Sequence, residues 1–518
     1  MQRSKQLYFE EEQVVRKYLL SSVIMLAFIL SSTFGPRAFA QEQQTLAEKL
    51  LIILKANHQI TQEQYDELLQ EAKKEKAAQK AAVAKQVKAQ TAKAAKEYKA
   101  EHPLGVNASW KNHELDFTSN DGNFTMHVGG RLQVDFGGAD LNDRMRDAFP
   151  TDFGGYGAEV RRARITLQGT MYHDFEWMAE SDFAGGNVVI TDLWLTYKGV
   201  PWFADVRIGH MKEPFSMEEL TSDNWLDFTE RSTANCFVTA NKYGDYNTGV
   251  MLFNTEFDKH MTWAIGGYMQ QNNKSGNSFQ GGFDNANIAA RVTYLPWYAD
   301  EGCQLVHLGF GFRHLFRSDN TGDWTSTIPA LQFQSGPEWH LPGVNTVNTG
   351  PLVAEGANEI NPEAAFVYGP FSMQGEYFQA FLSNYTTNDV TFTNPALSGY
   401  YIMASYFLTG EHRNYDRNSG VFSRPKLLCN FNPNAGSWGA WEIAARYSAI
   451  NLNDKSLSAS NDGGTEQDWT GSLVWYLNPN VRWLFDYVHA HVDSREVGTV
   501  FLQNGDANIF DTRFQVVW

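Results

Sequence analysis

The sequence is poor in cysteine and in long apolar runs. Its 518 residues include three cysteines, Cys236, Cys303 and Cys429, and no C-x-x-C pair. A small and odd number excludes a disulfide framework as the basis of the fold, and whether one pair forms stays open. A single run, near the start, approaches the roughly 20 apolar residues of a membrane-spanning helix, which excludes a bundle of such helices.

Motifs for covalent or metal chemistry are also missing. The chain has no G-x-S-x-G elbow, P-loop, H-E-x-x-H pair or zinc-spaced Cys/His set. Acidic residues outnumber basic ones, 59 to 42, for a net charge of −17. The sequence therefore predicts no enzyme, no metal, no cofactor and no nucleic-acid partner. The adjacent Glu218 and Glu219 leave one alternative open, an enzyme housed in a barrel, which would need two opposed acids or a nucleophile–base pair.

Aromatic residues, by contrast, are plentiful. They make up 14% of a chain whose mean hydropathy is only −0.41. This combination suits a protein with a wet interior and a thin apolar exterior band.

Residues 1–40 are predicted to be a secretory signal peptide. Arg16 and Lys17 supply the positive charge, residues 18–30 form the apolar core, and Ala38-Phe39-Ala40 is a small-x-small cleavage site, so the mature chain would begin at Gln41. A retained membrane anchor is the alternative. The short apolar core and the cleavage site favour removal.

Residues 41–103 are predicted to form a basic helical stalk. Apolar residues follow a helical period through residues 45–70. Residues 72–100 are rich in Ala and carry nine Lys against two Glu, a charge of 9 − 2 = +7. Two interpretations stay open: a solvated, partly disordered spacer, or a periplasmic coiled-coil stalk that oligomerises or touches anionic cell-wall polymer. Residues 104–123 are predicted to be a linker.

From Phe124 to the last residue, the apolar residues repeat at every second position. Phe124, Met126 and Val128 fall on one face, and His127 and Arg131 fall on the other. In a soluble sandwich the apolar face would meet a second sheet, whereas in a membrane barrel it meets lipid. An aromatic residue closing the last alternating strand favours the membrane.

Sixteen such segments can be placed. An even number of strands closes a barrel without edges, and sixteen leave an aqueous channel. The sequence thus predicts an all-β protein, a 16-stranded antiparallel transmembrane barrel over residues 124–518, in the bacterial outer membrane with the stalk in the periplasm. The segments lie near 124–136, 159–171, 174–183, 188–198, 204–212, 246–254, 261–270, 287–295, 304–315, 359–368, 371–381, 399–409, 439–450, 468–477, 481–490 and 507–518.

Short turns alternate with long connections along the predicted barrel. Leu477-Asn478-Pro479-Asn480 joins two strands tightly, whereas 137–158, 317–358 and 411–437 are long and rich in Gly, Asn, Asp and Pro. Short periplasmic turns and long outer loops are typical of porins.

Several short stretches of the barrel region match the motifs of a known protein family and occur in the same order as in that family. They are Gly129-Gly130-Arg131-Leu132-Gln133, Arg161-Arg162-Ala163, Gly209, Pro214-Phe215-Ser216-Met217-Glu218-Glu219-Leu220-Thr221-Ser222, Glu230-Arg231-Ser232, Tyr406-Phe407-Leu408-Thr409-Gly410-Glu411, Gly439-Ala440-Trp441-Glu442 and Arg446-Tyr447. Together they resemble the phosphate-selective porin O and P family over most of residues 120–518. The resemblance implies a homotrimeric porin whose arginine ladder attracts anions, with Arg131, Arg161 and Arg162 at ladder positions.

The resemblance also assigns the loop 213–245. It matches the third loop of the family, which folds into the lumen and narrows it. One residue departs from the pattern: Glu219, beside Glu218, stands where the phosphate-selective members have a pore lysine. The residues predicted to line the pore or bind solute are Arg131, Arg161, Arg162, Arg164, Arg207, Lys212, Glu218, Glu219 and Arg231.

The function predicted from these observations is passive diffusion of small charged solutes, with anions such as phosphate as candidates. Selectivity depends on the charges at the narrowest point rather than on net charge. The lumen arginines could instead brace the wall by pairing with carboxylates. The alternative function is a structural protein that tethers the envelope through its stalk.

Overall fold

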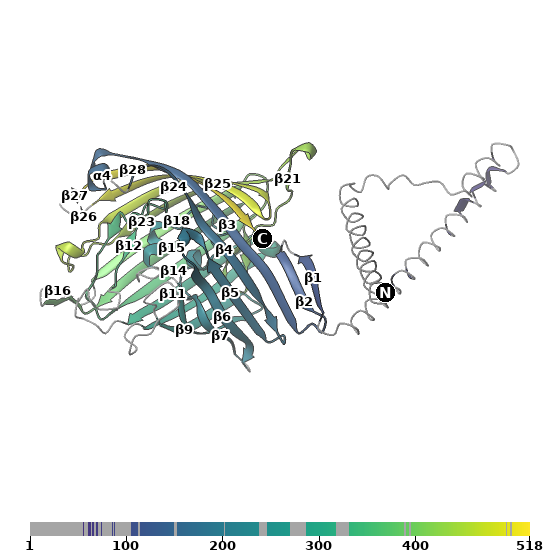
Figure 1. The fold of residues 1–518 in the computed structure, drawn as a ribbon, viewed down its shortest axis with the longest axis horizontal. Helices are drawn as coiled ribbons and strands as arrows, with labels where there is room; N and C mark the ends of the chain where they lie inside the picture. The colour runs from purple at the N-terminus through teal and green to yellow at the C-terminus, as the bar shows by residue number, and fades with distance from the viewer. Residues whose placement is uncertain are drawn as a thin grey trace, which may run out of the picture. The chain divides into compact units, whose positions relative to one another are not determined.

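The computed structural model describes a β-rich unit that begins at residue 105 (Figure 1). It describes residues 105–518, apart from 112–113, 150–152, 201–202, 238–245, 270–285, 317–330, 388–389, 393–394, 494 and 498–499, and a few residues between Lys55 and Lys88. The predicted signal peptide and nearly all of the predicted stalk lie outside the described residues. In the described part of the chain, no helix has the length and apolar character to cross a membrane.

The main sheet has 18 strands. Sixteen of them form a barrel, and the other two, β1 and β2, form a hairpin attached to it. Each barrel strand pairs antiparallel with its neighbours in chain order, and the last strand pairs with the first, which closes the sheet. The predicted 16-stranded antiparallel barrel is therefore confirmed. The barrel strands are β3 (Phe124–Leu141), β4 (Gly155–Met171), β5 (Phe175–Asp182), β6 (Val189–Val200), β7 (Ala204–Lys212), β8 (Tyr246–Glu256), β9 (Met261–Met269), β10 (Ala286–Ala299), β11 (Gln304–Phe316), β14 (Gly356–Tyr368), β15 (Phe371–Ser383), β18 (Ala396–Phe407), β23 (Ala440–Asn451), β24 (Thr465–Asn478), β25 (Val481–Asp493) and β28 (Gly505–Val517).

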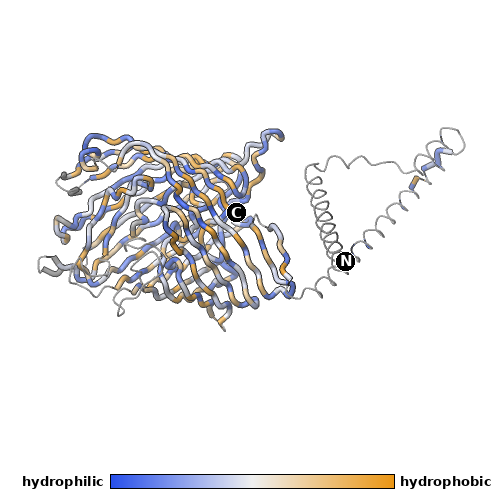
Figure 2. Tube along the Cα trace, in the orientation of Figure 1, coloured by the Kyte–Doolittle hydropathy of each residue, from blue (hydrophilic) through white to orange (hydrophobic). Residues whose placement is uncertain are grey.

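The barrel wall carries apolar residues outside and charged residues inside. On β11, Leu308 and Phe310 are exposed, whereas His307 before them and Arg313 after them are buried. Successive side chains of a strand point to opposite faces, so a two-residue period places each class on one face. Figure 2 shows the resulting alternation of colour along the strands. This inverts the pattern of a soluble protein, in which charged residues are mostly exposed.

Shorter elements decorate the barrel. The hairpin of β1 (Val106–Lys111) and β2 (Glu114–Ser119) lies within the predicted linker and pairs with the start of β3. The helices are α4 (Asp143–Ala148), α5 (Met217–Leu220) and the 3₁₀ turns η2 (Ala184–Gly186), η3 (Thr233–Phe237), η4 (Asp300–Gly302), η5 (Pro433–Ala435) and η6 (Ala459–Asn461). The small hairpins are β12–β13 (Gln334–Ser335, Val347–Asn348), β16–β17 (Tyr385–Thr387, Val390–Phe392), β19–β20 (Asn414–Asp416, Val421–Ser423), β21–β22 (Phe431–Asn432, Ser437–Trp438) and β26–β27 (Arg495–Val497, Val500–Leu502).

One long connection lies at the end of the barrel opposite to the one expected. Because neighbouring strands run in opposite directions, the link between β18 and β23, residues 408–439, shares its end with the short turns 172–174, 369–370 and 479–480. The prediction that 411–437 is an outer loop is therefore wrong. Length and composition identified a long connection, but only the number of strands before it determines the end at which it lies.

Candidate pore constriction

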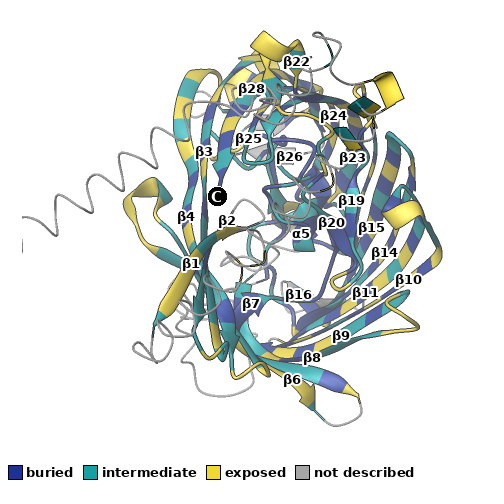
Figure 3. Ribbon diagram, turned by 90° about the vertical axis from the view of Figure 1, so that its right-hand side faces the viewer, coloured by how far each residue is buried: buried dark blue, intermediate teal, exposed yellow. Residues whose placement is uncertain are grey.

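The connection after β7 enters the barrel. Its described part, residues 213–237, is called the lumen loop below, and Figure 3 shows its helix α5 inside the ring of strands. The backbone N–H groups of Met217 and Glu218 donate to Glu376 of β15, at 3.1 and 2.7 Å. The N–H of Thr229 donates to Asp486 of β25 at 2.7 Å. The loop therefore contacts several parts of the inner wall.

Two aromatic side chains anchor the lumen loop against glycines of the wall. A Cβ atom on Gly399 would lie 2.9 Å from the ring of Phe237, and one on Gly311 would lie 3.1 Å from the ring of Phe215. Both distances are shorter than carbon–carbon contact, so a larger residue at either glycine would displace the loop. Phe237 also stacks on Phe378 of β15, with 5.9 Å between ring centroids.

The lumen loop is acidic, and the wall that faces it is basic. Its acids are Glu213, Glu218, Glu219, Asp223, Asp227 and Glu230 against the single Arg231, a formal charge of 1 − 6 = −5. When charged side chains are buried, they are stable only if each has a partner of opposite charge, because burying an unpaired charge costs free energy. The loop and the wall are thus complementary in charge as well as in shape.

Asp223 is a shared ion-pair partner of three arginines of the first barrel strands. Its carboxylate pairs with Arg131 of β3 and lies 2.6 Å from Arg162 and 3.8 Å from Arg164, both of β4. Burial alone would raise the pKa of Asp223, but Arg131, Arg162 and Arg164 outweigh burial and hold the pKa well below the usual range. Asp223 is therefore ionised at neutral pH.

A β-bulge explains why two adjacent arginines both face inward. Gln133 pairs with Arg162, but the next residue, Val134, pairs with Val160, so Arg161 is the extra residue of β4. In a regular strand Arg161 would point outward. Instead, its Nε and Nη2 donate to the two oxygens of Glu230 in the lumen loop, at 2.8 and 3.0 Å.

Arg446 of β23 holds the lumen loop and the connection between β11 and β14 together. It donates to Glu218 at 3.1 Å and to the carbonyl of Glu230 at 3.0 Å. It also donates to Glu338, from the connection between β11 and β14, at 2.6 Å. Burial, the largest influence, raises the pKa of Glu218, and Arg446 only partly offsets it.

Glu219, at the position where the family resemblance leads us to expect a lysine, lies between two cations. Lys212 pairs with its carboxylate and donates to its carbonyl at 2.6 Å. Arg231 lies 3.2 Å from the same carboxylate. Arg207, also predicted to line the pore, lies elsewhere on the inner wall: it stacks on Trp194, 3.7 Å from the ring centroid, and donates to Thr196 at 2.9 Å.

A second segment enters the lumen from the short-turn end. It is the hairpin β19–β20 of the 408–439 connection, called the lumen hairpin below, which Figure 3 shows inside the ring. Tyr415 of the hairpin and His307 of β11 are joined by a 2.6 Å hydrogen bond. Beside the hairpin, Arg413 lies 3.4 Å from Asp227, and Arg424 lies over the ring of Trp225 at 5.0 Å. Segments from both ends of the barrel therefore meet inside it.

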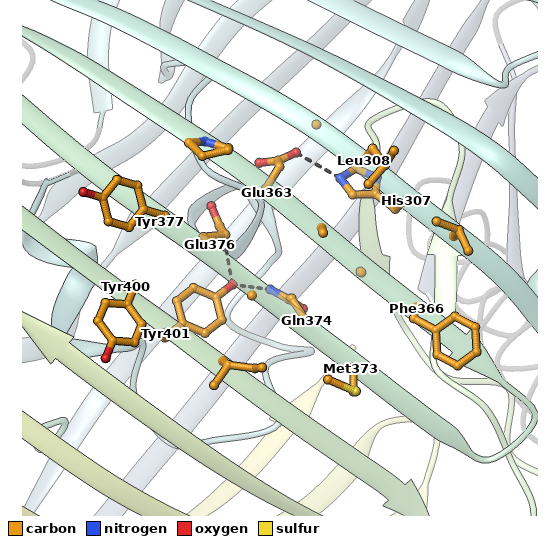
Figure 4. Close-up of a pocket in the computed structure, with 17 residues that line it drawn as sticks. His307, Leu308, Glu363, Phe366, Met373, Gln374, Glu376, Tyr377, Tyr400 and Tyr401 are labelled. Atoms are coloured by element: carbon orange, nitrogen blue, oxygen red, sulfur yellow. Dashed lines mark hydrogen bonds and ion pairs between the residues drawn. The ribbon is translucent and has the colours of Figure 1, made fainter.

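A separate cleft of about 880 Å³ lies on the wall formed by β11, β14, β15 and β18 (Figure 4). The lining residues whose polar side chains point into the barrel are nearly inaccessible. Among them, the Tyr401 hydroxyl donates a hydrogen bond to Glu376 at 2.7 Å on the lumen side of the wall. The exposed lining residues, Leu308, Tyr400 and Ile402 among them, are on the outward face. The cleft therefore opens to the outside of the barrel and is no part of the lumen.

Comparison with known proteins decides the family. The family model described as "Phosphate-selective porin O and P" matches residues 126–518. The chain belongs to this family. Porin O of Pseudomonas aeruginosa is 25% identical over 430 residues, which cover 78% of this chain and 91% of that protein, and an uncharacterized protein of Caulobacter vibrioides is 28% identical over 407 residues, 77% of this chain and 73% of that one. Among solved structures, the outer membrane channel DcaP of Acinetobacter baumannii matches with a TM-score of 0.47 and 13% identity, over 78% of this chain and 99% of that one.

Membership in the phosphate-selective porin O and P family makes the protein an outer-membrane channel for passive diffusion, and it implies a channel rather than an enzyme. Of the nine predicted site residues of this porin, eight are brought together around the lumen loop, and Arg207 is not. Asp223, Glu230 and Asp227 were missed as partners of the arginines. Their signal was the acidic composition of a loop expected to face an arginine-rich wall.

Proposed function

We propose that small charged solutes cross the lumen beside the lumen loop, and that the predicted site residues other than Arg207 line this path. The observation that carries the proposal is the docking of an acidic loop on the arginine-bearing inner wall of β3 and β4. Such a loop narrows the lumen and sets its charges, and selectivity depends on the charges at the narrowest point.

We further propose a preference for anions, although Glu219 replaces the family lysine. Within the ion pairs of the loop, the cations retain more accessible surface than most of their partners. The side chains of Lys212 and Arg231 are 18% and 12% exposed, whereas the Glu219 carboxylate between them is 2% exposed. A passing solute would therefore meet ammonium and guanidinium groups more than carboxylates. The counterexamples are Glu230, which is 15% exposed beside 1% for Arg513, and two nearly inaccessible pairs, Arg446 with Glu218 and Arg313 with Glu213, in which the acid is the slightly more exposed member.

The test is the reversal potential of the purified protein in a planar bilayer across a chloride gradient, repeated with phosphate. An anion preference is expected, reduced in Lys212→Gln because this substitution uncovers the Glu219 carboxylate. Lys259→Gln, which removes the same charge from an exposed turn, is the matched control and should behave as the parent. A cation preference in the parent would refute the anion proposal, and equal effects of the two substitutions would refute the role of Lys212.

The assembly and the stalk are also proposals. We expect a homotrimer, as the family resemblance implies, embedded in outer-membrane lipid with residues 41–103 in the periplasm. The charge of residues 72–100 supports contact with an anionic cell-wall polymer. Native mass spectrometry of the detergent-purified protein tests the trimer, and co-sedimentation with purified cell wall at low and high salt tests the stalk.

A further inference from the structure

The last part of the 408–439 connection, from residue 427 onward, is uncharged and aromatic. Residues 427–441 contain no Asp, Glu, Lys or Arg, whereas 19% of the whole chain is charged. Within them, β21 and β22 form a hairpin in which Phe431 pairs with Trp438, closed by Gly436 in the left-handed region at φ 72°. This segment, residues 427–438, is called the rim hairpin below.

The rim hairpin is fastened to the outward face of the barrel. Trp475 of β24 donates from its indole nitrogen to the carbonyl of Trp438 at 2.8 Å. The ring of Phe431 meets the ring of Trp475 edge to face, with 5.3 Å between centroids, and Trp475 stacks on Trp441 of β23 at 5.0 Å. Trp441 and Trp475 alternate with buried Glu442 and Val474, so both belong to the outward set. The hairpin is thus tied to side chains of the outward face.

Beyond this attachment the rim hairpin is uncovered. Leu428 is 69% exposed and Trp438 is 61% exposed. Figure 1 shows β21 projecting past the barrel strands near the C-terminus. Large apolar side chains in contact with water would lose the free energy of burial, so a surface of this kind indicates a partner.

We propose that the rim hairpin binds the headgroup–acyl boundary of the membrane leaflet at the short-turn end of the barrel. Three observations favour lipid as the partner. The hairpin continues the outward aromatic surface of β23 and β24, which already faces lipid in an outer-membrane barrel. It presents Trp, Phe and Leu without charge, and amphipathic aromatic rings favour the membrane–water boundary. Around its turn it carries Asn432 and Asn434, both exposed, whose amides can hydrogen-bond headgroups.

The exposed Cys429 provides a probe at the hairpin itself. We would replace Cys236 and Cys303 by Ser, label Cys429 with bimane, and reconstitute the full chain in vesicles of phosphatidylethanolamine and phosphatidylglycerol. Quenching is measured with lipids spin-labelled high on the acyl chain, with lipids labelled near its end, and with aqueous iodide. We expect several-fold stronger quenching by the shallow spin label than by either of the others.

A matched probe and a matched variant make the result decisive. Asp258→Cys, in the chain without other cysteines, labels an exposed short turn at the same end of the barrel and should be quenched mainly by iodide. Replacing both Leu428 and Trp438 by Ser should move the Cys429 label towards the iodide-quenched behaviour of that control. A Cys429 label quenched by iodide as strongly as the control would overturn the proposal. So would a label shielded from all quenchers that crosslinks to a second copy, because the partner would then be protein.

Discussion

At the scale of single residues, the arginines expected to attract solutes are largely occupied by the protein itself. Arg162 has 6% of its side chain exposed and pairs with Asp223. Arg513 of β28, which is outside the predicted set, has 1% exposed and pairs with Asp135. Arg513 links Asp135 of the wall to Glu230 of the lumen loop, at 2.6 Å in both contacts. Removing one member of such a buried pair leaves the other charge unpaired, which lowers the stability of the fold by about 3–5 kcal/mol. The first role of these arginines is therefore to hold the lumen loop in position, and any action on a solute is secondary to it.

Removing the charge of Asp223 tests this view. In Asp223→Asn the arginines around it lose their main counter-charge, so the docked loop should lose about 3 kcal/mol of stability and anion preference should rise. Reversal potentials and thermal unfolding measure the two effects. Asp143→Asn removes the same charge from a side chain that is 95% exposed on α4 and should change neither. Equal results for the two variants would contradict the assignment.

The ion pairs also predict how the channel responds to acid. Burial would raise the pKa of Asp223 and of Glu230, but neighbouring arginines hold both values well below the usual range. A carboxylate with a lowered folded-state pKa stabilises the docked loop fully above its ordinary pKa, about 4, and loses this effect as the pH falls towards the lowered value. The effect of acid on Glu218 has the opposite sign. Burial raises the pKa of Glu218, so its protonation relieves the cost of burying the charge.

We therefore expect steady single-channel current from neutral pH to about pH 5, and rising current noise below about pH 4 as the loop undocks. In Asp223→Asn the noise should be present at neutral pH. A large change confined to the range between pH 7 and pH 5 would point to groups whose pKa is raised, Glu218 among them.

At the scale of elements, the sixteen strands were predictable because one face of each contacts an apolar medium and the other a polar one. The β1–β2 hairpin was not predicted, although Val106, Ala108 and Trp110 alternate with polar residues, because a six-residue strand carries few repeats of the pattern. The inward direction of Arg161 followed from the family resemblance and could not be predicted from the alternation of its own strand. A bulge is a property of how two strands pair, and single-strand alternation placed Arg161 and Arg162 on opposite faces.

The loops were the least predictable part of the candidate site. That the lumen loop enters the barrel followed from family resemblance, not from its residues. Which acid would meet which arginine depended on contacts between segments distant in sequence, such as Glu218 with Arg446. The lumen hairpin was missed for the same reason, because Arg413 and Tyr415 acquire their roles only from Asp227 and His307 across the lumen.

Packing of the lumen loop can be tested at a glycine. Gly399→Val would place side-chain atoms where Phe237 and Ala234 now lie, and overpacking of this kind typically costs about 1–3 kcal/mol. We expect a destabilised loop and a larger, noisier conductance in planar bilayers. Gly471→Val is the control, because a Cβ atom there meets nothing within 4 Å on the outward face. Conductance equal to that of the control would show that Phe237 does not anchor the loop.

At the scale of the whole molecule, residues 103–518 form one compact unit, and the described contacts of the barrel are made between residues of this unit. Closure by β28 on β3 leaves no free edge in the barrel itself, and the connections that contain the lumen loop and the lumen hairpin begin and end on barrel strands. The chain divides between His102 and Pro103 into two units. A pore and a tether therefore depend on different parts of the chain.

Deleting residues 41–103 separates these two functions. The shortened protein should fold, resist unfolding by detergent until heated, and keep the single-channel conductance and reversal potential of the parent, because every proposed pore residue lies after residue 103. Envelope attachment, measured as outer-membrane blebbing in cells that make only the shortened protein, should suffer if the stalk is a tether. Normal conductance with a damaged envelope would mean that the chain has both functions. Loss of conductance in a correctly folded barrel would contradict the placement of the pore, because the solute path would then require the stalk.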